Sequence, residues 1–136
     1  MNILVIDAQG GGIGKQVIAA IKKEFTGIMI TAVGTNSIAT AAMLKAGADN
    51  GATGENAVIV GCRKADMIIG PIGIVIADSL FGEVTPAMAV AVGQSRAKRL
   101  LIPVNHCDNH IVGVPDLGLG KLIAEVVREI RGVCCV

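Results

Sequence analysis

Short apolar runs alternate with segments of helical periodicity along the first part of the chain. Residues 3–6 form an apolar run that ends in polar and glycine residues, as a buried parallel strand does. Across residues 13–25, apolar positions recur at helical spacing with basic residues between them. Residues 28–33 predict a second strand, and Gly34-Thr35-Asn36 turns into an Ala-rich helix that ends near Gly47. The chain therefore begins as strand, helix, strand, helix.

The middle of the chain gives weaker signals. Residues 49–55 are polar and contain glycines, so we expect a loop there. Residues 56–65 predict a short helix and 67–69 a strand, although three β-branched residues weaken the helix signal. The apolar residues 74–80 fit a buried helix or a buried strand, and we favour the helix.

The last third resumes the alternation. Thr85-Pro86 predicts a capped helix start, with the helix running to residue 95. We expect strands at 100–104 and 111–114, then a final amphipathic helix from about 115 to 131. This order predicts right-handed crossovers and a mainly parallel sheet, which is an α/β, Rossmann-like three-layer sandwich. With 136 residues and neither a repeat nor a linker, residues 1–136 are expected to form a single domain.

Composition adds an expectation of self-association. The chain is 52% hydrophobic with a mean hydropathy of +0.66, which fits strands covered on both faces and an apolar surface buried in a homo-oligomer. Glycine and proline interrupt the longest uncharged apolar run, 67–77, which is shorter than the roughly 20 residues of a membrane span. The N-terminus lacks the basic region of a signal peptide, so we expect a cytoplasmic protein without a membrane partner.

Charge and aromatic content narrow the range of partners. Twelve basic and eleven acidic residues give a net charge of +1, which leaves no excess cation for a nucleic-acid backbone. Trp and Tyr are absent, so little is available to stack on a flavin ring or on splayed bases. The four cysteines lack the spacing of a secreted disulfide framework, and we expect reduced thiols. At the terminus, Cys134 and Cys135 fit a redox or metal-capture tail or, as we favour, a frayed end.

The most informative segment is the glycine-rich turn at residues 8–14, between the first strand and the first helix. In this context backbone N–H groups and a helix N-terminus bind phosphate. Gly12 would let a pyrophosphate approach the backbone, and Gly14 would let the helix lie close to the sheet. A tight turn alone needs fewer than four glycines in five residues, so we expect a small phosphate-bearing ligand here.

Two known phosphate-binding turns are similar to this one. The turn resembles that of short-chain dehydrogenases, with Ala8 in place of the first glycine; those enzymes use a catalytic tyrosine, which this chain lacks. It also looks like the phosphate loop of ParA-type and nitrogenase-iron-protein-type ATPases. There Gly10 stands where the signature lysine belongs, and Gln16 replaces the hydroxyl that binds Mg²⁺, which argues against ATP hydrolysis.

The rest of the ligand is less well defined. A dinucleotide site has an acidic residue near the end of the second strand, and residues 34–36 contain none. Thr35 or Asn36 could bind a ribose or a 2′-phosphate, although we favour capping of the next helix. NAD(P) or another nucleotide stays open as the cofactor. The residues predicted to bind it are Gln9, Gly10, Gly11, Gly12, Ile13, Gly14, Lys15, Thr35, Asn36, Gly70, Pro71 and Gly73.

Three carboxylates are candidates for acid–base chemistry: Asp7, Asp78 and Glu83. Asp7 ends the first strand, where it would repel a phosphate unless it is protonated, turned away or bridged by a metal; a turn contact fits equally well. Asp78 follows a long apolar run, where we favour a salt bridge or an oligomer contact over catalysis. His106, Cys107 and His110 share one loop without a second cluster, so no metal site is predicted.

Four separated motifs resemble one family. They are Val5-Ile6-Asp7-Ala8-Gln9-Gly10-Gly11-Gly12-Ile13-Gly14, Gly34-Thr35-Asn36, Gly54-Glu55-Asn56-Ala57 and Ile69-Gly70-Pro71-Ile72-Gly73. They are similar to a family of small bacterial proteins described as a domain of unknown function, DUF3842-like. The resemblance covers nearly the whole chain and implies a Rossmann-like fold without a particular reaction. In that family the position of Ala8 is usually glycine, and the loop with His106 and His110 usually lacks both histidines.

Three hypotheses of function follow. The first is a nucleotide-binding module, such as a sensor or an accessory subunit, with phosphate at residues 10–14. The second is an enzyme acting on a small phosphorylated or carboxylated metabolite, which requires Asp7, Asp78 or Glu83 beside the glycine turn. The third is a structural, oligomeric interaction protein whose sheet edge a partner chain closes.

Overall fold

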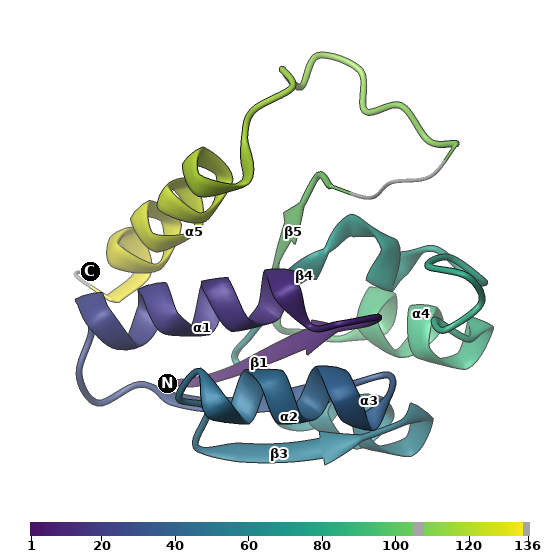
Figure 1. Ribbon diagram of the computed structural model, residues 1–136, viewed down its shortest axis with the longest axis horizontal. Coiled ribbons are helices and arrows are strands. Elements are labelled where there is room, and N and C mark those ends of the chain that lie inside the picture. Colours follow the sequence, from purple (N-terminus) through teal and green to yellow (C-terminus); the bar gives the residue numbers. More distant parts are fainter. Residues whose placement is uncertain (105–107, 135–136) are drawn as a thin grey trace.

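The chain forms a parallel sheet with helices on both faces (Figure 1). The computed structural model describes residues 1–104 and 108–134. The strands are β1 (Asn2–Asp7), β2 (Met29–Gly34), β3 (Asn50–Thr53), β4 (Met67–Pro71) and β5 (Lys98–Ile102). The helices are α1 (Gly12–Glu24), α2 (Ser37–Lys45), α3 (Glu55–Lys64), α4 (Pro86–Gln94) and α5 (Leu119–Cys134), with a short 3₁₀ helix, η1 (Ile72–Val75). The expected α/β, Rossmann-like sandwich is confirmed.

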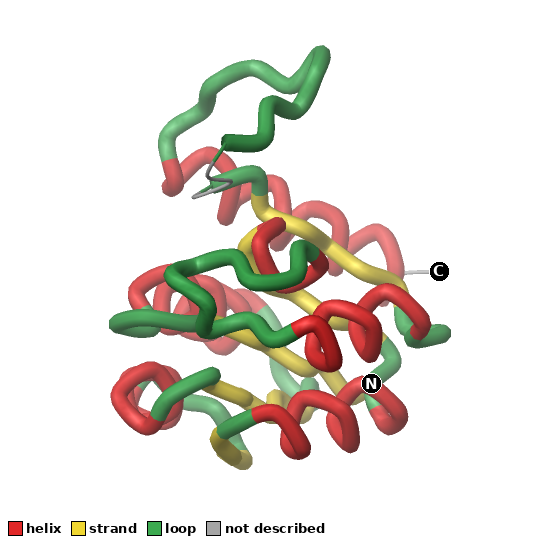
Figure 2. Tube along the Cα trace, turned by 90° about the vertical axis from the view of Figure 1, so that its right-hand side faces the viewer, coloured by secondary structure: helices red, strands yellow, loops and turns green. Residues whose placement is uncertain are grey.

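The strand order β3-β2-β1-β4-β5 places β1 at the centre of the sheet. The chain first winds outward from β1 to β2 and β3, then returns to the other side of β1 and continues through β4 to β5. This reversal puts α1 and α2 on one face and α3 and α4 on the other, and α5 joins α1 (Figure 2). In such sheets the crevice at the carboxyl ends of the strands, where the winding reverses, is the usual ligand position.

The central strand supplies both halves of the core. Ile3 and Val5 face α1, α2 and α5, whereas Leu4 and Ile6 face α3 and α4, and all four are buried. A strand buried on both faces has no polar alternation, which explains the continuous apolar run at residues 3–6. The β1–β2 register runs without interruption from Asn2↔Met29 to Asp7↔Gly34, so the ends of these two strands lie side by side.

The prediction of a loop at residues 49–55 was wrong, because this segment contains β3. The strand pairs with β2 from Thr31↔Asn50 to Gly34↔Thr53. Its sequence, Asn-Gly-Ala-Thr, has no buried residue, so it carries neither of the two hydrophobic patterns that indicate a strand. Pairing with β2, and not burial, forms this element.

Two other expected elements are also absent. Residues 74–80 do not form a helix, since η1 ends at Val75 and the positive φ angles of Asp78 and Leu80 are incompatible with a right-handed helix. Residues 111–114 are not a strand but an irregular, largely exposed segment without a neighbouring strand. The last helix begins at Leu119 rather than near 115, and β5 spans 98–102 rather than 100–104. Within the described part of the chain, no helix combines the length and apolarity that crossing a bilayer requires.

Gly70→Ala tests the close approach of β1 and β4. A Cβ at Gly70 would lie 2.5 Å from the carbonyl oxygen of Ile6, which belongs to the sheet backbone and cannot move away. We expect the substitution to lower the free energy of unfolding by about 1–3 kcal/mol, measured by urea denaturation. The control is Gly93→Ala in α4, where no atom lies within 4 Å of the added methyl and the higher helix propensity of alanine should add up to about 1 kcal/mol. Equal stabilities for the two variants would contradict this account.

Candidate functional site

The turns after β1, β2 and β4, which are far apart in the sequence, meet at the carboxyl edge of the sheet. The Asn36 side-chain amide donates to the carbonyl oxygen of Gln9 at 2.9 Å, which joins the first two turns. The backbone N–H of Gln9 donates to Oε1 of Glu83 at 3.0 Å, which brings in the third. These hydrogen bonds therefore bring the three turns together at one edge of the sheet.

Asp7 holds the glycine turn from inside the protein. Its Oδ1 accepts from the Ala8 amide at 2.8 Å and its Oδ2 from the Gly14 amide at 2.6 Å, so one carboxylate joins both ends of the turn. The side chain is buried, with 3% exposed. Burial raises the pKa of Asp7 above its ordinary value; hydrogen bonds from Gly14, Ala8 and Ile13 oppose this rise, and the negative charge of Glu83 adds to it. The oxygens of Asp7 are engaged with the turn itself.

The glycines of this turn divide into two pairs. Gly11 has a φ of +73°, and a Cβ there would lie 2.9 Å from the backbone of Ala39. A Cβ at Gly14 would lie 2.5 Å from the sulfur of Met43 in α2, so both glycines let α1 and α2 pack closely. At Gly10 and Gly12, by contrast, no atom lies within 4 Å of an added Cβ.

The amides of Gly10 and Gly12 also differ from their neighbours in hydrogen bonding. The Gly11 amide donates to the carbonyl of Ala8, and that of Gln9 to Glu83. No described residue accepts from the amides of Gly10 and Gly12. The turn therefore offers two amides next to the N-terminus of α1, fewer than its glycine content alone indicates.

The carboxylate of Glu83, which belongs to the loop between β4 and α4, lies beside the turn after β2. Its Oε1 accepts from the Thr35 hydroxyl at 2.7 Å and the Asn36 amide at 2.6 Å, in addition to the Gln9 amide. Partial burial raises its pKa, but the hydrogen bonds from Thr35, Gln9 and Asn36 outweigh that effect and lower the pKa below its ordinary value. Glu83 is therefore ionised at neutral pH. No described residue donates to its second oxygen, Oε2.

The loop after η1 places this carboxylate by an unusual backbone path. Asp78, Leu80 and Phe81 have positive φ angles, which cost on the order of 1–3 kcal/mol each in non-glycine residues. This path is stabilised by the backbone amide of Asp78, which donates to the carbonyl of Val84 at 2.8 Å. The side chains of Leu80 and Val84, which are buried in the core, stabilise it further. Glu83, next to Val84, is thereby directed toward the turns after β1 and β2.

The remaining predicted residues have various positions. Asn36 caps α2 through a hydrogen bond from the Ala39 amide to its Oδ1, as favoured from the sequence, but it and Thr35 also hold Glu83. Gly70 and Gly73 are buried, and neither contributes a side chain to the edge. Lys15 is exposed on the first turn of α1. Asp78 is exposed, and its carboxylate has no contact with the glycine turn. His106, Cys107 and Cys135 lie outside the described residues.

Sequence reasoning identified Glu83 only as a possible acid–base group. It did not predict that Glu83 accepts hydrogen bonds from the turn after β2, because 48 residues separate Glu83 from Thr35. The available signal was indirect. The sequence has no acidic residue in the turn after β2, and Glu83 lies in the loop after β4, which flanks β1 on the side opposite β2.

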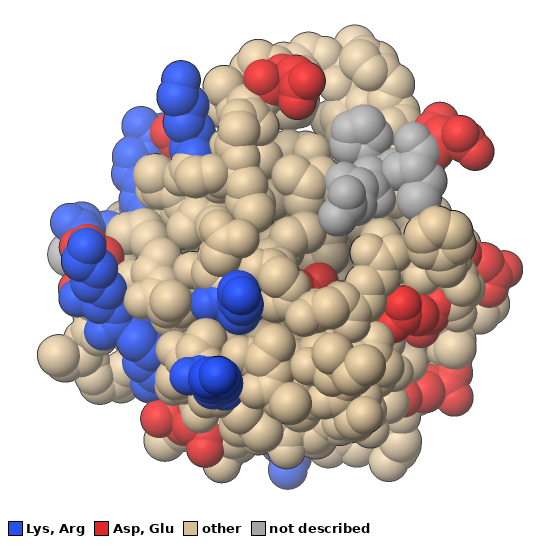
Figure 3. Space-filling model, in the orientation of Figure 1, with Lys and Arg blue, Asp and Glu red and all other residues tan. Residues whose placement is uncertain are grey.

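Charge is distributed unevenly between the two ends of the strands. Figure 3, in the orientation of Figure 1, shows most Lys and Arg side chains gathered at the amino ends, with some Asp and Glu among them, and Asp and Glu alone toward the carboxyl ends. Glu55, Asp78 and Glu83 belong to the acidic side, whereas Lys45 and Lys64 end helices on the basic side. An acidic edge disfavours further negative charge close to Glu83 and favours hydroxyl groups there.

A parallel sheet of this order, with a glycine turn after its central strand, defines a Rossmann-like α/β protein. The model of the family "Domain of unknown function (DUF3842)" matches residues 2–134, and the chain belongs to this family. No curated protein matches the sequence. Among solved structures, the dodecameric FMN-dependent UbiX-like decarboxylase from Escherichia coli O157:H7 is 13% identical with a TM-score of 0.47, over 100% of this chain and 95% of that one. The fold assignment rests on the strand order, to which this likeness adds nothing.

Asp7→Asn tests the clamp on the glycine turn. The amide group of asparagine keeps one acceptor oxygen but places an NH₂ group opposite a backbone N–H, because both carboxylate oxygens of Asp7 accept amides. We expect a loss of about 1–3 kcal/mol in the free energy of unfolding. Asp66→Asn is the control, since the exposed Oδ2 of Asp66 accepts the Asn2 amide at 2.7 Å and water can replace that bond. The clamp would be refuted by a cost for Asp7→Asn no greater than the roughly 0.5 kcal/mol expected of the control.

Proposed function

We propose that this protein binds a ribonucleotide or a dinucleotide at the carboxyl edge of the sheet, between the glycine turn and Glu83. The observation that supports this proposal is the position of Glu83 at the end of β2, with Oε1 held by the protein and Oε2 without a donor among the described residues. A carboxylate near the end of the second strand accepts the ribose hydroxyls in dinucleotide-binding α/β proteins. Here the fold supplies that carboxylate from a distant loop.

Thr35 and Asn36 act in this proposal as positioning residues. Their donors, together with the Gln9 amide, hold Oε1 at 2.6–3.0 Å, so the carboxylate is oriented before a ligand arrives. Preorganisation lowers the entropic cost of binding, and an ionised acceptor makes stronger hydrogen bonds to hydroxyls than a neutral one does. Oε2 is then the acceptor for the ribose.

The phosphate is assigned to the amides of Gly10 and Gly12. They adjoin the N-terminus of α1, where the helix dipole favours an anion, and the space above both glycines is open. Lys15, one helical turn further on, adds a cation. Asp7 does not turn an oxygen toward this position, because the amides of Ala8 and Gly14 take both.

The charge of the site sets its selectivity. Glu83 is ionised, so a 2′-phosphate on the ribose would be repelled. The proposal therefore favours a ligand with free ribose hydroxyls, of the NAD type rather than the NADP type. It assigns binding without a reaction, as in a sensor or an accessory subunit, because Asp7 is engaged with the turn and Asp78 does not contact it.

Glu83→Gln separates ribose recognition from folding of the loop. Glutamine keeps an oxygen for the three donors but removes the negative charge from the ribose position. By isothermal titration calorimetry with NAD and AMP, we expect affinity to fall about tenfold or more, since a hydrogen bond to a charged group contributes about 1.5–3 kcal/mol. Wild type should also prefer NAD to NADP and AMP to its 2′,3′-dideoxy analogue, and the variant should lose both preferences.

Asp78→Asn is the matched control. It removes one charge from the same exposed loop, at a left-handed position that asparagine tolerates, and should leave affinity unchanged. Two results would contradict the proposal. One is the absence of a thermal shift with any of these nucleotides at millimolar concentration, where a ligand at 100 times its Kd adds about 2.7 kcal/mol. The other is an equal loss of affinity in both variants.

A further inference from the structure

The outer edge of β3 lacks a partner among the described residues and has little protection. β3 pairs on one side only, with β2, and all four of its residues are exposed. Successive residues of a strand turn their backbone groups to opposite edges. The Gly54 amide donates inward to the carbonyl of Gly34 at 2.9 Å and the Ala52 carbonyl accepts from the Thr40 hydroxyl at 3.1 Å, so the amides of Gly51 and Thr53 face outward. Edge strands are ordinarily protected by charged residues or proline, and β3 contains neither.

Apolar groups border this edge on both faces of the sheet. On the α2 face, Ile38, Ala41 and Leu44 are exposed at three-residue spacing, Ile38 by 70% and Leu44 by 43%. Leu44 lies over Gly51 of β3, where an added Cβ would be 2.8 Å from its side chain. The opposite face carries a groove of about 410 Å³, lined by residues of β1, β2, β3 and α3 that include Met29, Thr31, Val33, Ala52, Ala57 and Val60.

The ends of β3 differ in charge. Lys64 lines the groove together with Asn50, the first residue of β3, and Lys45 ends α2 five residues before that strand; both lysines are exposed. At the other end, the exposed Glu55 follows Gly54 directly after the strand. Its Oε1 accepts a hydrogen bond from the Thr85 hydroxyl at 2.6 Å, which leaves the carboxylate charge uncompensated.

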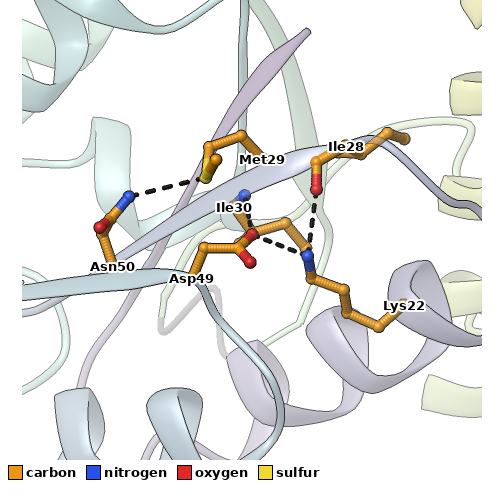
Figure 4. Close-up of polar contacts among 6 residues, drawn as sticks. All are labelled: Lys22, Ile28, Met29, Ile30, Asp49 and Asn50. Atoms are coloured by element: carbon orange, nitrogen blue, oxygen red, sulfur yellow. Dashed lines mark hydrogen bonds and ion pairs between the residues drawn. The ribbon is translucent and has the colours of Figure 1, made fainter.

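Asp49 does not cancel the positive end of the strand. Figure 4 shows its carboxylate turned inward, where Oδ2 accepts from the Lys22 ammonium at 2.7 Å and from the Ile30 amide at 2.8 Å. The charge of Asp49 is thus paired within the chain. In the same view the Asn50 side chain reaches the sulfur of Met29. The edge is therefore positive where β3 begins and negative where it ends.

We propose that two copies of this chain associate through β3, in antiparallel alignment about a twofold axis, to form one continuous sheet. The twofold axis pairs the outward backbone groups of Gly51 and Thr53 reciprocally and brings the Ile38 and Leu44 faces of the two α2 helices together. It also sets the lysine end of each strand against the Glu55 end of the other. A parallel alignment would juxtapose like charges. This surface goes beyond the proposed nucleotide site and does not depend on it.

The first test removes an outward backbone donor. Thr53→Pro eliminates an N–H group that does not pair with β2, so the sheet within each copy keeps its hydrogen bonds. Thr53→Val is the matched control, since it removes only the hydroxyl that bonds the Thr40 hydroxyl at 2.7 Å. Sedimentation velocity should show wild type and Thr53→Val as dimers at micromolar concentrations and Thr53→Pro with a dimer Kd raised about tenfold or more. Far-UV circular dichroism confirms that the Thr53→Pro variant is folded. A monomeric wild type, or a folded Thr53→Pro variant that dimerises equally well, would overturn the proposal.

Charge reversal provides a test that is independent of backbone changes. Glu55→Lys alone, and Lys45→Glu with Lys64→Glu, should each raise the dimer Kd about tenfold or more, because like charges then face each other across the axis. The triple variant restores opposite charges and should return the Kd to near the wild-type value. Lys98→Glu, on the opposite edge strand β5, serves as the control and should have no effect. Failure of the triple variant to restore association would also exclude this alignment.

Discussion

The hydrogen bonds from Ala8 and Gly14 to Asp7 are the constraint on which the candidate site depends. A single buried carboxylate at the tip of the central strand joins both ends of the glycine turn and thereby fixes where α1 begins. The close packing of α1 on α2 at Gly11 and Gly14 follows from that starting point. So does the direction of the Gln9 amide, which meets Glu83. The cost of burying this carboxylate is visible in its raised pKa.

The glycines of the turn have two different structural roles, and the composition of the turn alone does not show which glycine has which role. Two of its glycines serve helix packing, and two leave open backbone amides at a helix N-terminus. The second carboxylate, Glu83, changes the character of the site, because in our proposal it accepts the ribose hydroxyls, and its negative charge disfavours a phosphate beside it. A nucleotide that places its phosphate at the turn and its free ribose hydroxyls at Glu83 satisfies both features.

Helix direction explains why the two ends of the sheet differ in charge. In a parallel α/β fold all the helices following strands start at the carboxyl edge, and acidic residues are stabilised near helix N-termini while basic residues are stabilised near C-termini. Glu55 at the start of α3 and Lys45 and Lys64 at the ends of α2 and α3 follow this rule. The same polarity underlies the selectivity that we propose for the nucleotide site. It also makes the charges at the two ends of β3 complementary to those of a second copy only in an antiparallel alignment.

The sequence by itself determined the fold class, the central strand, the glycine turn and the helix caps at Asn36 and Thr85, because burial periodicity and capping depend on residues close together in the chain. The tertiary structure decided the rest. β3 forms through pairing with β2 and has no hydrophobic pattern of its own. The left-handed residues after η1 are tolerated because Leu80 and Val84 anchor that loop in the core. Glu83 reaches Thr35 across 48 residues only because the winding reverses at β1 and brings the turns after β2 and β4 to either side of it, a contact that no local pattern specifies.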